Sequence, residues 1–205
     1  MSDRRWLQQR SARLGQDMGV PTHVALLRGV NLAGRNRVAM ADLRGVVESL
    51  GHTEVATYIQ SGNVVFTAGA RDTGAVAAAL EQAIANTLRV RAAVVVLTRD
   101  ELAAVVAGNP YPGEPDPKLV HVVFTAGEIG VEAAAAVAAA EQRARAKGSA
   151  DEARVAGRVL YLHTPGGIGR SELATQLNRL GEPTGTTRNW ATVGKLLALC
   201  DPNTR

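Results

Sequence analysis

The sequence predicts an α+β protein made of two consecutive halves with mainly antiparallel sheets. Short β-branched runs alternate with longer segments in which apolar residues recur at helical spacing. The order of these elements in residues 22–98 recurs in residues 118–205. Between the halves, residues 109–117 contain four prolines, which exclude a regular helix or strand there. These three observations together predict the architecture.

The first half begins with a strand followed by a helix. Val24 to Leu27 is a short apolar run that ends before Gly29, which is typical of a buried strand. Between Met40 and Leu50, apolar residues recur at the spacing of one helix face. The loop at 31–38 therefore runs from a strand end to a helix start, where backbone amides commonly converge on anions.

A hairpin, a second helix and another strand complete the first half. The runs Val55–Gln60 and Val64–Thr67 flank Ser61-Gly62-Asn63, which is typical of a β-hairpin. Asp72 is a candidate N-cap for a helix with an apolar residue at every fourth position. Ala92–Leu97 predicts the last strand. The resulting order, β-α-β-β-α-β, is that of the ferredoxin-like split unit.

The second half repeats this order after a connecting helix, which the capping-box pattern Thr98-x-x-Glu101 predicts. Its predicted strands are Leu119–Thr125, Glu152–Val155, Arg158–His163 and Gly185–Arg188, and its predicted helices are Val131–Lys147, Ser171–Leu180 and Asn189–Cys200. We therefore assign a disordered leader to 1–21, the first ferredoxin-like half to 22–98, a connecting helix and proline-rich linker to 99–117, and the second half with its C-terminal helix to 118–205. We expect the two halves to be separable folds.

Composition limits the classes of function. With 46% hydrophobic and 20% charged residues, the chain has enough apolar material for a globular core. The net charge of +4 admits nucleic acid as a partner, but half of it lies in residues 1–21 and aromatic residues make up only 3%. No apolar run approaches the roughly 18 residues that span a bilayer. Because Cys200 is the only cysteine, we expect a reducing, cytoplasmic compartment.

The first candidate site is the loop after the first predicted strand. Its polar residues are Arg28, Asn31, Arg35, Asn36 and Arg37, with Gly29 and Gly34 between them. No acidic residue lies between Val20 and Ala41, so this positively charged loop suits a phosphate or carboxylate. The alternative is that these side chains only terminate the strand and pair with nearby acids.

The second candidate site is the glycine-rich segment 163–171, which leads from a strand into a helix. Its candidate anion ligands are Gly167, Gly169, Arg170 and Ser171. It does not match a dinucleotide-binding fingerprint, because Glu172 stands where the third glycine belongs, and it lacks the Gly-Lys-Ser/Thr of a Walker loop. A simple turn with an N-cap is the alternative.

The third candidate site combines the hairpin turn with the start of the last helix. Its members are Gln60, Ser61, Gly62 and Asn63 in the turn, and Arg188, Asn189, Trp190, Thr192 and Lys195. The alternative for the four turn residues is that their side chains only stabilise the hairpin turn. The helical spacing of Trp190 with Val193 favours packing of Trp190 in the core. If the last helix lies against the first loop, five cations share one cleft.

The sequence offers little for metal or nucleophilic chemistry. The four histidines, at 23, 52, 121 and 163, show no metal-binding spacing. The chain has no G-x-S-x-G elbow. We expect no metal, no cofactor and no membrane partner, and the oligomeric state stays open.

Several motifs resemble a family of bacterial proteins called domain of unknown function 1697. They are LLRGVN at 26–31, GRN at 34–36, TYIQSGNVVF at 57–66, NP at 109–110, G-x-x-G-x-S at 166–171 and RNW-x-TV-x-KL at 188–196. The resemblance covers residues 22–199 and implies a pair of ferredoxin-like halves. It implies no activity and no catalytic residues, and the family does not explain the leader.

Three classes of function therefore remain. The leading hypothesis is binding of a phosphate-bearing metabolite, a nucleotide or a nucleic-acid backbone in a cleft near the loop from Arg28 to Arg37. The first alternative is an acylphosphatase-like hydrolase, in which an arginine-bearing loop holds phosphate and an asparagine orients water. The second is a protein-interaction module that uses open sheet faces or edges.

Overall fold

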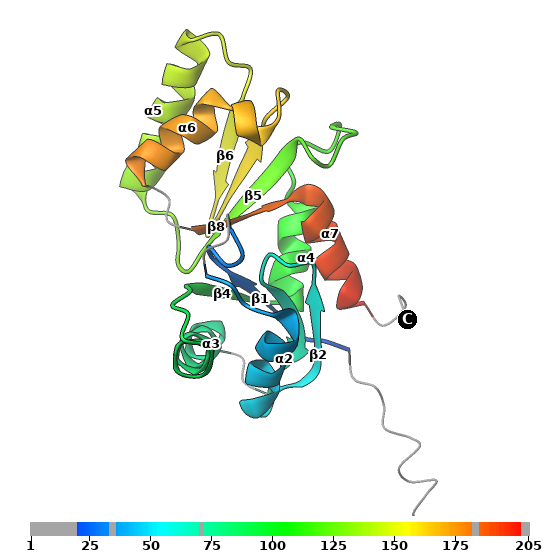
Figure 1. The fold of residues 1–205 in the computed structure, drawn as a ribbon. Helices are drawn as coiled ribbons and strands as arrows, with labels where there is room; N and C mark the ends of the chain where they lie inside the picture. The colour runs from blue at the N-terminus through cyan, green and yellow to red at the C-terminus, as the bar shows by residue number, and fades with distance from the viewer. Residues whose placement is uncertain (1–19, 33–35, 70–71, 182–184, 202–205) are drawn as a thin grey trace, which may run out of the picture.

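The computed structural model describes residues 20–32, 36–69, 72–181 and 185–201. The predicted leader therefore lies outside the described residues, except for its last two positions. Within the described part, the chain is an α+β protein with two four-stranded antiparallel sheets and six α-helices (Figure 1).

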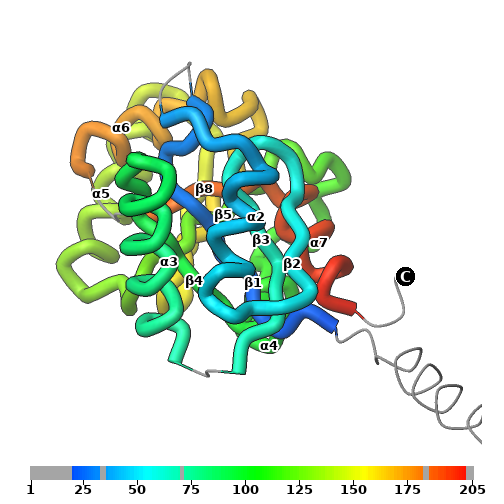
Figure 2. Tube along the Cα trace, turned by 60° about the horizontal axis from the view of Figure 1, so that its bottom comes forward, coloured from blue at the N-terminus to red at the C-terminus, as the bar shows by residue number. Residues whose placement is uncertain are grey.

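The first sheet has the strand order β2-β3-β1-β4 and is antiparallel throughout. Its strands are β1 (His23–Leu27), β2 (Thr53–Tyr58), β3 (Asn63–Thr67) and β4 (Val94–Thr98), and its helices are α2 (Met40–Ser49) and α3 (Thr73–Leu88). Figure 2 shows both helices on one side of this sheet, with the second half of the chain on the other side.

The second sheet has the corresponding order β6-β7-β5-β8 and is also antiparallel. Its strands are β5 (Val120–Thr125), β6 (Glu152–Ala156), β7 (Val159–His163) and β8 (Gly185–Asn189), and its helices are α5 (Val131–Ala146), the 3-10 turn η1 (Ile168–Arg170) and α6 (Glu172–Leu180). Two further helices, α4 (Arg99–Ala107) and α7 (Trp190–Leu199), follow the last strand of each half and pack against each other.

The predicted helix starts are confirmed by their caps. The Asp72 carboxylate accepts hydrogen bonds from the backbone amides of Gly74 and Ala75 at the start of α3. At the start of α4, the Thr98 hydroxyl accepts from the Glu101 amide while the Glu101 carboxylate accepts from the Thr98 amide. These bonds satisfy amides that have no partner within the helix, so local sequence fixes both starts.

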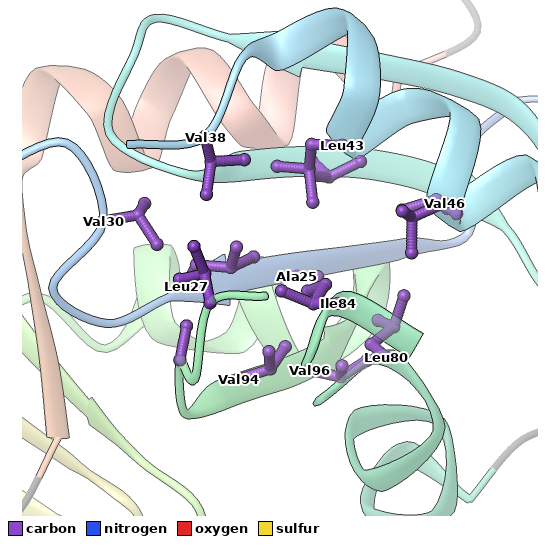
Figure 3. Close-up of a cluster of buried hydrophobic side chains, with 14 of the residues drawn as sticks. Ala25, Leu27, Val30, Val38, Leu43, Val46, Leu80, Ile84, Val94 and Val96 are labelled. Carbon is purple, nitrogen blue, oxygen red and sulfur yellow. The ribbon is translucent and has the colours of Figure 1, made fainter. Parts of the chain in front are cut away.

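Strand alternation divides the buried side chains into three clusters. In β1, Ala25 and Leu27 face α2 and α3 in the first cluster (Figure 3), whereas Val24 and Leu26 face the opposite side. The third cluster lies between the second sheet and the helices α5 and α6. Each sheet therefore has one face covered by its own pair of helices.

The second, central cluster joins the two halves. It takes Val24 and Leu26 from the first sheet, Phe124 and Tyr161 from the second, and further apolar residues from α4 and α7. The Tyr161 hydroxyl donates a hydrogen bond of 2.8 Å to the Val105 carbonyl of α4. Burying one large apolar side chain contributes about 1.5–3 kcal/mol, so this shared layer is a substantial part of the stability of both halves.

The β2–β3 hairpin differs from its sequence prediction at the turn. Strand β2 ends at Tyr58 rather than Gln60, because Ile59 has a φ of 49° and Gly62 a φ of 72°. Both values lie in the left-handed region, which breaks the strand, and this conformation is uncommon for a β-branched residue such as Ile59. The turn is therefore longer than the tripeptide predicted from the sequence.

The segment between the halves, residues 108–119, contains no helix or strand. It is nevertheless held in place by side chains. The Glu114 carboxylate lies 2.7 Å from the imidazole Nε2 of His163 on β7, and the Tyr111 ring packs on the same imidazole at 5.1 Å between centroids. Hydrogen bonds from the Asp116 amide and from His163 hold the pKa of Glu114 below its usual value.

Candidate functional site

The loop after β1 is held closed by Asn31. Its Nδ2 donates hydrogen bonds of 2.9 Å to the carbonyl oxygens of Val38 and Gln60, while its Oδ1 accepts from the Val38 amide at 2.9 Å. The backbone amide of Asn31 donates to Asn36. Asn31 has a φ of 55°, a conformation that asparagine tolerates better than most residues. The Asn31 side chain therefore fixes both the loop and its attachment to the β2–β3 turn.

The other loop residues fall into different groups. Asn36 Nδ2 donates to the Gly29 carbonyl at 3.1 Å, so this amide also closes the loop. Arg28 and Arg37 are exposed, and Arg35 and Gly34 lie outside the described residues. The structure thus gives both asparagines protein partners, which favours the structural alternative for them, and leaves two described arginines facing solvent.

Arg188 on β8 connects the second half to the β1 end and to the hairpin turn. Its acceptors are the carbonyl oxygens of Leu27, Ser61, Gly62 and Thr187 and the side-chain oxygens of Asn63 and Thr186. The bonds to Leu27 and Ser61, at 2.8 and 3.0 Å, both come from Nη2. Three motifs that are distant in sequence therefore meet around one guanidinium.

This guanidinium is buried, with 8% of the residue exposed. Burial lowers its pKa to about 10, so the side chain remains charged at neutral pH. No carboxylate of a described residue contacts it, and neutral oxygens alone compensate the charge. Because all of its nitrogens donate to protein atoms, these contacts favour a structural role for Arg188 over the predicted role as an anion ligand.

The glycine-rich segment 163–171 forms a turn and a helix cap. The Ser171 hydroxyl accepts from the Ala174 amide and donates to the buried Asp151 carboxylate, both at 2.8 Å. Arg170 Nε donates to the Gly166 carbonyl, and Gly167 adopts a φ of 83°. Ser171 and Arg170 thus have protein partners, and exposed Gly169 is not joined to the first loop by any described contact.

The remaining candidates lie at the start of α7. Asn189 caps this helix by accepting from the Thr192 amide, and Trp190 packs against the central cluster as its spacing predicted. Lys195 is exposed on α7. Of the five expected cations, Arg35 lies outside the described residues. Among the other four, Arg188 is enclosed by the network above and Lys195 is exposed on another element.

A cavity of about 390 Å³ lies where the two halves meet, on the face of the second sheet that α6 partly covers. Arg28 contributes from the end of β1, and the apolar wall consists of Val123, Leu160, Leu162, Ile168, Ala174 and Leu177. Polar and glycine positions complete the lining with His121, Asn178, Gly181, Gly185 and Thr187. None of the described lining residues is acidic, and no described residue forms an ion pair or side-chain hydrogen bond with Arg28.

His121 on β5 is the buried polar residue of this cavity. It is 7% exposed, and its Nδ1 has no hydrogen-bond partner among the described residues. Burial lowers the pKa of His121, so the imidazole is neutral at neutral pH. Leaving a buried polar atom without a partner costs about 1–3 kcal/mol, which is uncommon in a purely structural position.

Sequence comparison places this architecture in a known family. The family profile described as protein of unknown function (DUF1697) matches residues 20–161, more than half of the chain. The chain belongs to the DUF1697 family. No curated protein matches this DUF1697 chain in sequence.

The DUF1697 fold is also similar to a solved structure, that of the conserved bacterial protein SP0830 from Streptococcus pneumoniae. The similarity has a TM-score of 0.65 and covers 89% of this chain and 100% of that chain. The two sequences are 20% identical, so this likeness concerns the fold alone.

Sequence reasoning missed His121, Asn178 and Thr187 as cavity residues. The available signal was strand alternation, which places His121 and Val123 on the same face of β5. No local pattern shows that Arg28, almost a hundred residues earlier, reaches this face. Such a site exists only after the two halves have docked.

The described residues contain neither a candidate metal cluster nor a candidate membrane-spanning helix. No group of three or more His, Cys, Asp or Glu side chains could hold a metal ion in the described part of this DUF1697 chain. Among the helices that the structure describes, none is both long enough and apolar enough to cross a membrane.

Proposed function

We propose that this DUF1697 protein binds a small organic anion in the cavity between Arg28 and the second sheet. The observation that carries the proposal is the position of Arg28, an exposed arginine without a described ion pair, at the rim of an apolar cavity. A volume of about 390 Å³ lies within the usual range for small-molecule sites. The ligand would therefore combine one acidic group with an apolar body.

The physical chemistry favours such a ligand over a polyanion. One guanidinium can form a bidentate pair with a carboxylate or with one face of a phosphate, and a charged hydrogen bond contributes about 1.5–3 kcal/mol. The six apolar lining residues would add about 25 cal/mol for each Å² of apolar ligand surface that they cover. A nucleic-acid backbone would need a row of cations, whereas Arg28 is the single cation among the described lining residues.

The test compares two exposed arginines of the same loop. We expect Arg28→Gln to abolish stabilisation by a panel of organic acids and phosphate monoesters in a thermal-shift assay. Arg37→Gln is the matched control, since Arg37 is exposed but does not line the cavity. Equal responses of both variants and the wild type, or no stabilisation of the wild type by any acid in the panel, would overturn the proposal.

The acylphosphatase-like alternative has less support. That activity needs an asparagine amide that can orient water, whereas the amides of Asn31 and Asn36 both donate to backbone carbonyls. Turnover of an acyl phosphate by the wild type, lost in Arg28→Gln, would restore this alternative.

The interaction-module alternative is weakened at the two edges of the first sheet. On the outer edge of β4, the Val94 amide donates to the Glu81 carboxylate at 2.7 Å, and Arg158 donates to the Val96 carbonyl at 3.0 Å. The edge strand β2 has an irregular register between Thr53 and Ala56. Occupied or irregular edges pair poorly with an added strand.

The finer account of the fold and the cellular setting is part of the same proposal. We infer that each half is a ferredoxin-like unit and that the chain arose by duplication, because both halves share one element order and one strand order. The bacterial origin of the structural neighbour supports a bacterial protein, and the single, buried Cys200 suits a cytoplasmic one.

A further inference from the structure

The cavity between the halves has an apolar wall and a polar mouth. Much of the wall is buried, as Leu160 and Leu162 on β7 are. The mouth consists of the exposed polar side chains of the lining, which are Arg28 after β1, Asn178 on α6 and Thr187 on β8. A ligand that fills the cavity would therefore keep its polar groups at one end and its apolar body at the other.

Contacts between β8 and the end of β1 place Thr187 beside Arg28. The side chains of Thr186 and Arg188 both donate hydrogen bonds to the Leu27 carbonyl, at 3.3 and 2.8 Å. Thr187 lies between these two donors in the chain, and Arg28 directly follows the acceptor. The backbone segments that carry Thr187 and Arg28 are therefore adjacent, and both residues line the same cavity.

The Thr187 hydroxyl is available to a ligand. Thr187 is paired with Val123 on β5, and both residues line the cavity, so they lie on the same face of the second sheet. Thr187 is exposed, and its hydroxyl forms no hydrogen bond with another described residue. A hydroxyl can both donate and accept hydrogen bonds. The mouth thus offers a neutral hydrogen-bonding group next to the cation.

We infer that the ligand is a small aliphatic carboxylic acid with an oxygen substituent, hydroxyl or keto, on the carbon next to the carboxylate. Arg28 would pair with the carboxylate, Thr187 would hydrogen-bond the neighbouring oxygen, and the aliphatic body would contact the apolar wall. A volume of about 390 Å³ is near the lower end of the range for small-molecule sites, which favours a small ligand. This inference rests on the proposed function, because it names the class of organic anion that the same cavity accepts.

The charges of the lining favour an oxygen over an ammonium group at this position. Arg28 is the single charged side chain among the described lining residues at neutral pH. An ammonium group beside it would face a like charge, and no carboxylate of the lining would compensate it. A hydroxyl or keto oxygen adds no charge and can accept a hydrogen bond from the Thr187 hydroxyl.

The experiment uses probes that share one carbon skeleton: 4-methylpentanoate, 2-hydroxy-4-methylpentanoate, 4-methyl-2-oxopentanoate and L-leucine. We expect calorimetric titration of the full chain to show at least one of the two oxygenated acids binding about two- to tenfold tighter than 4-methylpentanoate, from one additional hydrogen bond. Leucine, which carries an ammonium group in place of the oxygen, should bind no tighter than 4-methylpentanoate.

Variants assign the two polar contacts. Thr187→Val removes the hydroxyl but keeps the branched shape, so it should abolish the preference for the oxygenated acid and leave the affinity for 4-methylpentanoate unchanged. Thr187→Ser keeps the hydroxyl and should retain the preference. Arg28→Gln should weaken all three acids that lack an ammonium group, by about tenfold or more. Thr87→Val, at an exposed position of α3 outside the lining, is the matched control.

The outcomes separate the inference from the function on which it rests. If 4-methylpentanoate binds as tightly as both oxygenated acids and Arg28→Gln weakens all of them, anion binding stands and the inference is wrong. The inference also fails if leucine binds tighter than the oxygenated acids, or if their advantage survives in Thr187→Val. If no acid binds in a manner that depends on Arg28, the proposed function itself fails.

Discussion

The Asn31 side chain donates a hydrogen bond of 2.9 Å to the Gln60 carbonyl, so the loop that follows β1 is attached directly to the β2–β3 turn. The same turn receives the Arg188 guanidinium from the second half. One short turn thus holds both the loop that carries Arg28 and the contact between the halves.

Replacing Asn31 with alanine should destabilise the protein by about 2–3 kcal/mol, because three hydrogen bonds contribute about 1 kcal/mol each. Asn31→Ala loses the hydrogen bonds and also strains the backbone at a φ of 55°. Asn31→Gly loses the same hydrogen bonds without that strain, since glycine tolerates this φ, so the difference between the two variants measures the strain. Urea unfolding measures both variants. Asn86→Ala, which removes an exposed amide of α3, is the control, and an equal loss in that variant would contradict the prediction.

Replacing Arg188 should affect stability even when the positive charge is retained. Arg188→Lys leaves a single nitrogen to serve oxygens that three nitrogens now contact, so we expect a loss of about 1.5–3 kcal/mol. Arg188→Met, which leaves the buried oxygens without donors, should cost more. Chemical unfolding of both variants tests this order. A lysine variant as stable as the wild type would show that the network contributes little.

The Gly62 position should tolerate no side chain. A Cβ there would lie 2.6 Å from a methyl group of Val30 and 2.7 Å from Cβ of Leu27, and the φ of 72° disfavours any L-residue. We expect Gly62→Ala to cost about 1–3 kcal/mol through backbone strain and overpacking. Gly113→Ala, at an open position without positive φ, should change stability by less than about 0.5 kcal/mol. Melting temperatures of the pair provide the comparison.

Acidification should destabilise the protein partly through His121. Burial places the pKa of its imidazole below the usual value of 6.5, so the unfolded chain binds a proton at a pH where the folded chain does not. The folded state is then favoured above about pH 6.5 and loses stability as the pH falls from there toward the lowered pKa. His121→Leu should flatten this part of the profile, measured as unfolding free energy between pH 7.5 and 5.

The control for that profile is His52→Gln. Burial lowers the pKa of His52 as well, so this variant should remove the His52 contribution to the pH dependence and leave the His121 contribution in place. If His121→Leu retains the full wild-type pH dependence, burial does not lower the pKa of His121 and the prediction is wrong.

Contrary to the expectation from the sequence that the halves are separable folds, the shared central cluster predicts that each half in isolation is far less stable than the whole. Residues 22–117 alone would expose Val24, Leu26 and their neighbours, which now lie in the central cluster with Phe124 and Tyr161. We expect this fragment to aggregate or to unfold without a cooperative transition in calorimetry. A soluble fragment with a sharp transition would instead confirm separable halves.

Local chemistry made most of the fold predictable. The caps at Asp72 and Thr98 depend on residues within three positions, and β1 lies within one residue of its predicted start. The hairpin end was misplaced because the left-handed conformation of Ile59 has no signal in its own side chain. The position of the hairpin end depends on hydrogen bonds that the turn accepts from Asn31 and Arg188, two residues that are distant from it in sequence.

The candidate site was predictable only in part, for the same reason. The sequence indicates that the motifs around Arg28, Asn63 and Arg188 are polar groups without an evident core role, and the structure brings Asn63 and Arg188 together. Sequence alone could not show which of the arginines is enclosed and which remains exposed. The Leu27 carbonyl accepts a hydrogen bond from Arg188, which is thereby enclosed. The side chain of the next residue, Arg28, lines the cavity and remains exposed.

The central cluster has a consequence for synthesis on the ribosome. Val24 belongs to it and so does Cys200, about 180 residues later, so the layer is complete only when almost the whole chain has emerged. At roughly 5–20 residues per second, the interval is on the order of 10–35 s. During that time the inner face of the first sheet is a patch of valine and leucine without its natural cover. The nascent chain is then a candidate client for a ribosome-associated chaperone.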